Sequence, residues 1–297
     1  MVSPGILLVD KPGGITSHDV VARTRRAFGT RKIGHAGTLD PMATGLLVLG
    51  VEGATRLLTY IVGADKTYTA TIRLGEATST DDAEGEVTAR ADAAAIAAVS
   101  EERIVAGVAG LTGVISQVPS TVSAIKVDGR RAYDRVRAGE AVVLKAREVT
   151  VSRFVVLERR DSRDAVELDI VVDCSSGTYI RALARDLGAE LGIGGHLTAL
   201  RRTRIGSFDV ADAVSTDDLV GAATIAPADA AARVLTRLDV TADEARDLRH
   251  GKRLAGQATR ADTYPAAAVD PEGSLVGIVE RRGADLKSAM NMPEEIR

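Results

Sequence analysis

Residues 34–53 constrain the fold more than any other stretch of the chain, and they read GHAGTLDPMATGLLVLGVEG. The first half is a loop of small and turn-forming residues around a single carboxylate, Asp40. The second half contains an apolar run, residues 46–51, that predicts a buried strand. Glycine allows close approach of the backbone, and a residue before proline is disfavoured in the α region, so Asp40 stands on a stiff loop before Pro41. The pattern predicts an acid displayed against a core strand.

Taken singly, these residues also fit an ordinary loop. An Asp-Pro pair in a Gly-rich segment is far more often a turn than a reactive group. His35 alone fits a loop surface residue better than a functional one. On this segment alone, both interpretations of Asp40 therefore stay open.

The composition is typical of a globular intracellular protein. A chain of 297 residues with 45% hydrophobic content predicts one large domain and a small one. The single cysteine, Cys174, excludes an internal disulfide framework and a Cys-rich metal site. We see no signal-peptide pattern and no apolar run of transmembrane length, so we expect a cytoplasmic protein without a membrane segment.

The charges are segregated along the chain, although the net charge is only −3. In residues 1–66 eight basic side chains stand against five acidic ones, whereas in residues 207–247 nine acidic side chains stand against three basic ones. A basic face can bind phosphate whatever the net charge, because the local field governs the contact. The distribution is compatible with a nucleic-acid partner but does not single one out.

Hydrophobic periodicity predicts strands and helices mixed along the chain, as in an α+β protein. Residues 66–74, KTYTATIRL, alternate in strand fashion with Tyr68 on the apolar side. Further strands are expected at 5–10, within 141–173, and at 264–269 and 274–281. Helices are expected at 16–28, 53–61, 93–111, 177–192 and 240–251.

Several separated motifs together resemble the TruB family of tRNA pseudouridine-55 synthases. They are GHAGTLDPMATG around Asp40, KPGGITS from Lys11, KTYTA around Tyr68, the block from Gln117 to Tyr133, and GTYIR ending at Arg181. The Gln117 block matches the family at Gln117, Pro119, Ser123-Ala124, Lys126 and the G-x-x-AY of residues 129–133, with one departure at Val122, where the family often has an aromatic residue. The resemblance covers roughly the whole chain and is loosest at the C-terminus.

The resemblance implies a fold and a domain division. The fold would be a pseudouridine synthase core on a mixed, mostly antiparallel sheet flanked by helices. Residues 1–233 would form the catalytic domain, with an RNA-binding insertion at about 113–145. Residues 234–297 would form a small PUA-like β domain.

The resemblance also implies roles for particular residues. Asp40 would be the essential catalytic carboxylate, Tyr68 would stack on the target base, and Arg181 would pair with Asp40. We expect His35 to fill the space that a flipped nucleotide leaves, since an imidazole face can stack on bases. The implied substrate-binding positions are His35, Leu200, Asp82, Lys11, Gln117, Lys126, Arg130, Arg131 and Tyr179. Arg201, Arg202 and Arg204 are expected to form a basic edge that grips RNA.

The implied reaction is isomerisation of a uridine in the T loop of tRNA, in which the glycosidic bond moves from N1 to C5 of uracil. The sequence leaves open whether Asp40 attacks C1′ or C6 or abstracts the 2′ proton. No metal or nucleotide cofactor is expected, because the four histidines lack ligand spacing and no phosphate-binding loop motif occurs. We expect a monomer that binds the T arm of tRNA.

Two other functions stay open on the sequence. A non-catalytic RNA-binding or RNA-folding protein on the same scaffold would predict loss of Asp40, Tyr68 or Arg181, and all three are present. A role in tRNA folding is nevertheless compatible with catalysis. A related synthase acting on another RNA, such as ribosomal RNA, is the other alternative.

Overall fold

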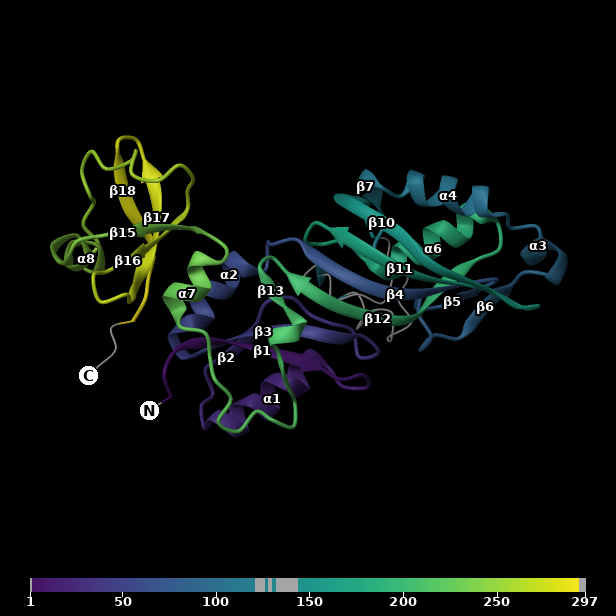
Figure 1. The fold of residues 1–297 in the computed structure, drawn as a ribbon, viewed down its shortest axis with the longest axis horizontal. Coiled ribbons are helices and arrows are strands. Elements are labelled where there is room, and N and C mark those ends of the chain that lie inside the picture. The colour runs from purple at the N-terminus through teal and green to yellow at the C-terminus, as the bar shows by residue number, and fades with distance from the viewer. Residues whose placement is uncertain (1, 121–125, 128–129, 132–143, 294–297) are drawn as a thin grey trace. The chain divides into compact units, whose positions relative to one another are not determined.

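The computed structural model describes residues 2–120, 126–127, 130–131 and 144–293. The chain divides into two compact units, which are described separately (Figure 1). The first unit consists of Met1–Leu39, Leu46–Ala64 and Ile205–Arg297, and the second of Asp40–Gly45 and Asp65–Arg204. The sequence predicts a different division, into residues 1–233 and 234–297. That division stays a prediction.

The first unit begins with a strand and a capped helix. Strand β1 (Gly5–Lys11) lies between β14 (Val214–Ser215) and β3 (Thr44–Val51), and β2 (Ile33–His35) pairs antiparallel with β3. Helix α1 (Ser17–Phe28) starts at a capping box, in which Thr16 and Asp19 each bond the other's backbone N–H. It ends at Gly29, whose φ of 65° is the left-handed conformation that glycine adopts readily. The apolar run 46–51 is buried, as the sequence predicts.

The rest of the first unit is a small sheet with short helices. Strands β15 (Thr236–Asp239), β16 (Ala266–Val269), β17 (Leu275–Arg282) and β18 (Asp285–Asn291) form a sheet in that order, with α8 (Ala242–Arg249) beside it. Ala267, Val269 and Ile278 of this sheet share one apolar cluster with Leu46 and Val48 of β3. One face of the small sheet therefore shares a core with β3, whereas Leu238, Leu248 and Val279 belong to a second apolar cluster formed only by residues 238–286. The remaining elements are η1 (Glu52–Leu57), α2 (Leu58–Ile61), β13 (Phe208–Asp209), η2 (Val210–Asp212) and α7 (Pro227–Ala232).

The second unit is a sheet with helices packed on it. Its strands run in the order β12 (Gly195–Ile205), β4 (Lys66–Leu74), β11 (Val166–Cys174), β10 (Arg147–Asp161) and β7 (Gly113–Gln117). Helix α6 (Ile180–Leu191) packs on β4 and on α4 (Glu101–Gly110), and α4 also touches β10. The smaller elements are β5 (Glu76–Thr78), β6 (Val87–Arg90), α3 (Ala93–Ala97), β8 (Lys126–Val127) and β9 (Arg130–Arg131). Antiparallel pairs β4–β11, β11–β10 and β10–β7 make this sheet mostly antiparallel, as expected.

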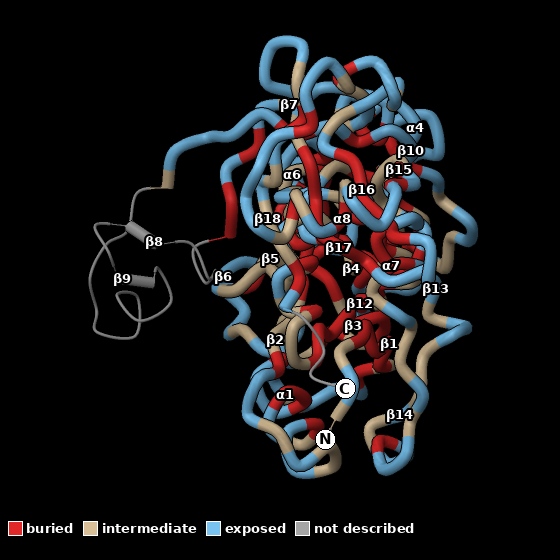
Figure 2. Tube along the Cα trace, turned by 90° about the vertical axis from the view of Figure 1, so that its left-hand side faces the viewer, coloured by how far each residue is buried: buried red, intermediate tan, exposed pale blue. Residues whose placement is uncertain are grey.

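Alternation along β4 has the predicted parity. Tyr68, Ala70, Ile72 and Leu74 are buried, and the residues between them are partly exposed. Figure 2 shows buried residues along the neighbouring strands β4 and β12. This parity turns the Tyr68 side chain to the buried face of its strand.

The loop that carries Asp40 is attached to the second unit by the first residues of β3. Thr44 and Gly45 pair in parallel with Arg201 and Arg202 of β12. Gly45 has a φ of 101°, and a Cβ there would lie 2.2 Å from the Arg202 carbonyl oxygen. Only glycine fits such a close approach, so Gly45 fixes where the loop meets the sheet.

Candidate active site

Arg181 forms the centre of a buried ion-pair cluster. It stands in the first turn of α6 and is 4% exposed. Its Nε lies 3.0 Å from Oδ2 of Asp40, and its Nη1 lies 3.0 Å from Oδ2 of Asp82. Nη1 also donates to the carbonyl of Thr80 at 2.8 Å. The pairing of Arg181 with Asp40 expected from the sequence is therefore present.

The two carboxylates of the cluster differ in exposure. The Asp40 side chain is 37% exposed, whereas that of Asp82 is 4% exposed. The other oxygen of Asp82 accepts bonds from the Thr80 hydroxyl at 2.5 Å and from the Glu84 backbone N–H at 3.1 Å. Asp82 is thus committed to holding Arg181, and Asp40 is the carboxylate that an incoming molecule can reach.

The loop around Asp40 forms a turn, and the Asp40 side chain also takes part in an ion pair. The Asp40 carbonyl accepts a bond from the Ala43 N–H at 3.1 Å, which closes a turn. The side chain of the same residue pairs with Arg181. Charge-assisted bonding to a guanidinium favours the ionised carboxylate and fixes its direction.

Tyr68 and Arg202 form a second buried pair near this cluster. Tyr68 is 8% exposed, and its hydroxyl accepts a hydrogen bond from Arg202, which is 1% exposed. Burial raises the pKa of Tyr68, and the nearby charge of Asp40 acts in the same direction. The Tyr68 hydroxyl is therefore protonated at neutral pH.

Arg202 corrects one expectation from the sequence. It was expected on a basic edge with Arg201 and Arg204, but its side chain is buried. The signal that identifies it is strand parity, since Leu200 and Arg202 are both buried on β12 while Arg201 between them is partly exposed. In a run such as RRTR, residues 201–204, one arginine can face the interior while its neighbours on the strand face solvent. Leu200 is 8% exposed, and its carbonyl accepts a bond from Thr44.

Lys66 lies on the same strand as Tyr68 and is 5% exposed. Burial, together with the nearby charge of Arg202, lowers the pKa of Lys66 to about 8. The second unit therefore carries three buried cations, Lys66, Arg181 and Arg202, among its described residues.

Gln117 and Tyr179 are joined to each other. The Gln117 side chain is buried, donates through Nε2 to the Tyr179 carbonyl at 3.0 Å, and accepts from the Tyr179 N–H at 2.9 Å. These two bonds fix the backbone directly before α6 and hence before Arg181. Direct contact of either residue with substrate stays a prediction.

Lys11 and His35 lie in the first unit. Lys11 is fully buried, and its Nζ donates to the carbonyls of Pro12 and Ile15 at 2.9 and 2.7 Å, which closes the turn before α1. The ring of His35 meets that of His18 edge to face at 5.5 Å. The substrate roles of both residues stay predictions.

The insertion is described only in part. Lys126 pairs with Arg131, and Val127 with Arg130, as two short antiparallel strands. The motif residues Val122, Ser123, Gly129 and Tyr133 lie outside the described residues. The predicted RNA contacts of Lys126, Arg130 and Arg131 stay predictions.

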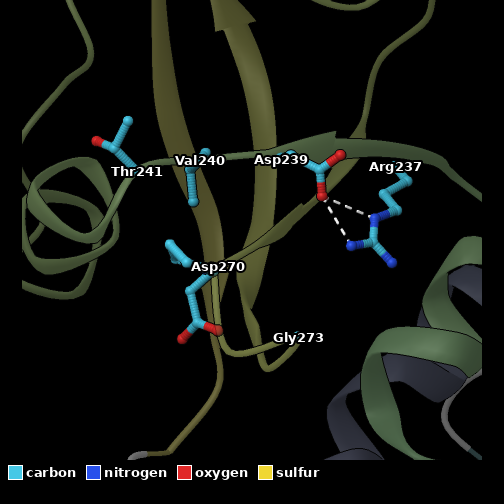
Figure 3. A pocket seen from close by; sticks show the side chains of 7 residues that line it. Arg237, Asp239, Val240, Thr241, Asp270 and Gly273 are labelled. Carbon is cyan, nitrogen blue, oxygen red and sulfur yellow. Dashed lines mark hydrogen bonds and ion pairs between the residues drawn. The ribbon is translucent and has the colours of Figure 1, made fainter.

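An open depression on the C-terminal sheet contains none of the predicted site residues (Figure 3). Its charged groups are already paired, since Arg237 bonds Asp239 at 2.8 Å and Asp270 bonds Arg249 at 2.8 Å. The Arg181 cluster is thus the better candidate for chemistry.

In the part of the chain that the structure describes, no group of three or more His, Cys, Asp and Glu side chains is placed to hold a metal ion. Within the same residues, none of the helices combines the length and apolarity that a bilayer crossing requires.

Solved structures define the class of this fold. One neighbour is described as an H/ACA RNP bound to a substrate RNA containing 2'-deoxyuridine; the TM-score is 0.71 at 24% identity, over 98% of this chain and 85% of that chain. A Cbf5-Nop10-Gar1 complex matches with a TM-score of 0.70 at 24% identity, over 98% and 84% of the two chains. Both neighbours share the fold of this chain, an α+β architecture with a mixed sheet flanked by helices and a small C-terminal sheet.

Comparisons of the sequence identify the family of the chain more specifically than the fold does. The family model for the N-terminal domain of TruB family pseudouridylate synthases matches residues 25–180, and the model for the C-terminal part of tRNA pseudouridine synthase II matches residues 235–293. A tRNA pseudouridine synthase B of Leifsonia xyli subsp. xyli (strain CTCB07) is 61% identical over 99% of this chain and 98% of its own. One of Arthrobacter sp. (strain FB24) is 55% identical over 96% and 95%. The chain belongs to the TruB family of pseudouridylate synthases.

Proposed function

We propose that this enzyme converts a uridine of the T loop of tRNA, the one at position 55, to pseudouridine, with Asp40 as the essential carboxylate. One observation carries the proposal: Arg181, held by buried Asp82, directs an accessible Asp40 in a chain of this family. The names of the relatives, tRNA pseudouridine synthase B, support tRNA as the substrate.

Asp40 begins the reaction. Its carboxylate attacks the nucleotide at C1′ or C6, or abstracts the 2′ proton, and each route breaks the N1 glycosidic bond. The Arg181 guanidinium keeps the carboxylate ionised and aimed, so little rearrangement is needed as charge moves. After uracil turns, C5 bonds to C1′, and the enzyme is restored as the bond between Asp40 and the nucleotide breaks or as the abstracted 2′ proton returns. The proton on C5 is then lost, and N1, which kept the electron pair of the broken glycosidic bond, ends protonated, so that the product is an isomer of the uridine.

Tyr68 supports the base during this rearrangement. Its ring stacks on uracil, and its protonated hydroxyl, placed by Arg202, relays a proton in the last step. A buried aromatic ring next to the reacting carboxylate also excludes water.

The nucleotide has to leave the stacked loop before it can react. Unstacking a base costs a few kcal/mol. We assign His35 to the vacated stack, and Lys126, Arg130, Arg131 and Arg204 to phosphate and 2′-OH contacts that recognise the T arm by its shape. Gripping the arm in this way is also compatible with a role in tRNA folding.

The test uses the purified chain and a T-arm stem-loop RNA. We expect pseudouridine at one uridine of the loop, detected by carbodiimide-dependent primer-extension stops, and no product when that uridine is replaced by cytidine. In cells lacking the chain, the same tRNA position should remain uridine. Conversion of ribosomal RNA without conversion of the stem-loop would overturn the assigned substrate.

A further inference from the structure

Arg181 is bound by the turn of residues 80–82. The middle residue of this turn has a strained backbone conformation, and the residues on either side of it accept hydrogen bonds from Arg181. Arg181 Nη1 donates hydrogen bonds to the Thr80 carbonyl and to the Asp82 carboxylate. Asp81, the residue between them, has a φ of 61°, in the left-handed region that residues other than glycine rarely adopt. The direction of both acceptors depends on this one backbone conformation.

The Asp81 side chain is anchored at two points. Its Oδ2 accepts a bond from the Ser120 hydroxyl at 2.6 Å and lies 3.3 Å from Nη1 of Arg185. Ser120 is fully buried, so its hydroxyl depends on this partner. The Asp81 side chain itself is 14% exposed, which limits competition from water.

Arg185 connects this anchor to the helix that carries Arg181. It stands one turn after Arg181 on α6 and also donates to the Val118 carbonyl at 2.8 Å. On the other side of the turn, the Asp81 carbonyl accepts from the Leu197 N–H of β12 at 3.1 Å. The turn of residues 80–82 is therefore tied to α6, to the segment after β7, and to β12.

We propose that Asp81 is a positioning residue of the active site: anchored by Ser120 and Arg185, it holds the turn so that Thr80 and Asp82 keep Arg181 directed at Asp40. The inference rests on the proposed function. Asp81 itself touches neither Asp40 nor the substrate; it acts through Arg181. Because the orientation of Asp40 matters most when the nucleotide reacts, loss of the anchor should lower kcat and leave KM nearly unchanged.

Asp81→Gly is the most informative variant. Glycine adopts the same φ without strain, so the substitution removes the anchor and keeps the backbone conformation accessible. Asp81→Asn retains an oxygen that can accept from Ser120 and should be a partial rescue. Ser120→Ala removes one anchor bond. Asp186→Asn is the matched control, because Asp186 pairs with the same Arg185 at 2.8 Å but pairs with none of the residues 80–82 of the turn.

We expect Asp81→Gly to lower kcat on the stem-loop about tenfold with KM within about twofold, and Ser120→Ala to lower kcat about threefold. Asp81→Asn should lie between wild type and Asp81→Gly, and Asp186→Asn should match wild type. In an Arg181→Lys background, Asp81→Gly should add little further loss, since two residues that act through one group are non-additive.

Three results would overturn the inference while wild type remains active: an unchanged kcat in Asp81→Gly, a rise in KM alone, or full additivity with Arg181→Lys. Thermal unfolding of each variant separates misfolding from mispositioning, and a folded Asp81→Gly enzyme with normal kcat decides against the inference. If wild type itself makes no pseudouridine in the stem-loop, the proposed function fails instead, so the two failures are distinct.

Discussion

Two arginine clusters of the second unit use the same groups in different surroundings. Arg181 binds Asp40 and Asp82 and is 4% exposed, whereas Arg160 on β10 binds Asp169, Glu158 and Glu167 and is 40% exposed. Both form close contacts, since Arg160 Nη2 lies 2.9 Å from Asp169 and Arg181 Nη1 lies 3.0 Å from Asp82. Contact distance therefore does not distinguish them, but burial does.

Burial changes what each cluster can do. An exposed pair is screened by water and typically contributes roughly 0.2–1 kcal/mol to stability. Removing one partner of a buried pair costs about 3–5 kcal/mol, because a charge is left in a poor solvent. The surface cluster is an ordinary feature of a sheet, and the buried one imposes a fixed direction on Asp40.

The largest effect is expected at Arg181. Arg181→Lys keeps the positive charge, but a single ammonium cannot bond both carboxylates and the Thr80 carbonyl in the same geometry. We expect kcat on the T-arm stem-loop to fall at least about a hundredfold, as for loss of one preorganised charge contact. Single-turnover conversion measures it, with Arg160→Lys as the matched control. A wild-type rate in Arg181→Lys would show that the buried cluster contributes no more to catalysis than the surface cluster around Arg160.

Tyr68→Phe should have the next largest effect. Phenylalanine keeps the ring that stacks on uracil and removes the hydroxyl that bonds Arg202. We expect kcat to fall by about ten- to a hundredfold, in the range of a lost proton-transfer group, with RNA binding unchanged. Wild-type turnover by this variant would exclude the proton relay and leave only a packing role for Tyr68.

The contribution of Lys66 to the free energy of unfolding should depend on pH. Burial lowers its pKa from 10.5 in the unfolded chain to about 8 in the fold. Between these values the unfolded state binds more protons, so the free energy of unfolding rises with pH across this window, and below pH 8 the cost of the buried charge is fully present. We expect wild type to gain stability relative to Lys66→Met from about pH 8 to 10.5.

Denaturant titrations across this pH window measure the difference between the two proteins. Lys252→Met is the control, because the Lys252 side chain is 64% exposed. A pH-independent difference between wild type and Lys66→Met would mean that Lys66 is solvated like Lys252.

The smallest effect is expected at Arg160. Its hydrogen bond to Asp169 lowers the pKa of Asp169 below 3.8, so this contribution is present above that pH and is lost as the pH falls through the folded value. Because both side chains are partly exposed, Arg160→Ala should lower the unfolding temperature only slightly at neutral pH and leave kcat unchanged. Thermal unfolding at pH 7 and pH 3 checks this; a large fall in the unfolding temperature would erase the distinction between the clusters.

The sequence predicted the strands better than it predicted the interior of the site. Alternation placed Tyr68 on the buried side of β4, and the apolar run after Gly45 is a buried strand. The partnership of Asp40 and Arg181 came from family motifs, because no local pattern relates residues so far apart in the chain. Their contact in the structure agrees with that expectation.

Three features of the site could not be predicted from the sequence. Arg202 lies in a run of basic residues that reads as a surface, and only strand parity turns it inward. Gln117 matches a motif, yet its amide is bonded to the Tyr179 backbone, which a motif does not specify. Asp81 and Asp82 are adjacent and chemically identical, and only the fold sends one to Ser120 and the other to Arg181.

The central claim is that Asp40, directed by Arg181, is the group that reacts with the uridine. Asp40→Asn has nearly the same shape and no charge, and it tests this claim most directly in a single-turnover assay with the T-arm stem-loop. The account predicts no detectable pseudouridine and RNA binding within about tenfold of wild type, a difference of at most ~1.4 kcal/mol. Appreciable pseudouridine formation by a folded, RNA-binding Asp40→Asn enzyme would contradict it.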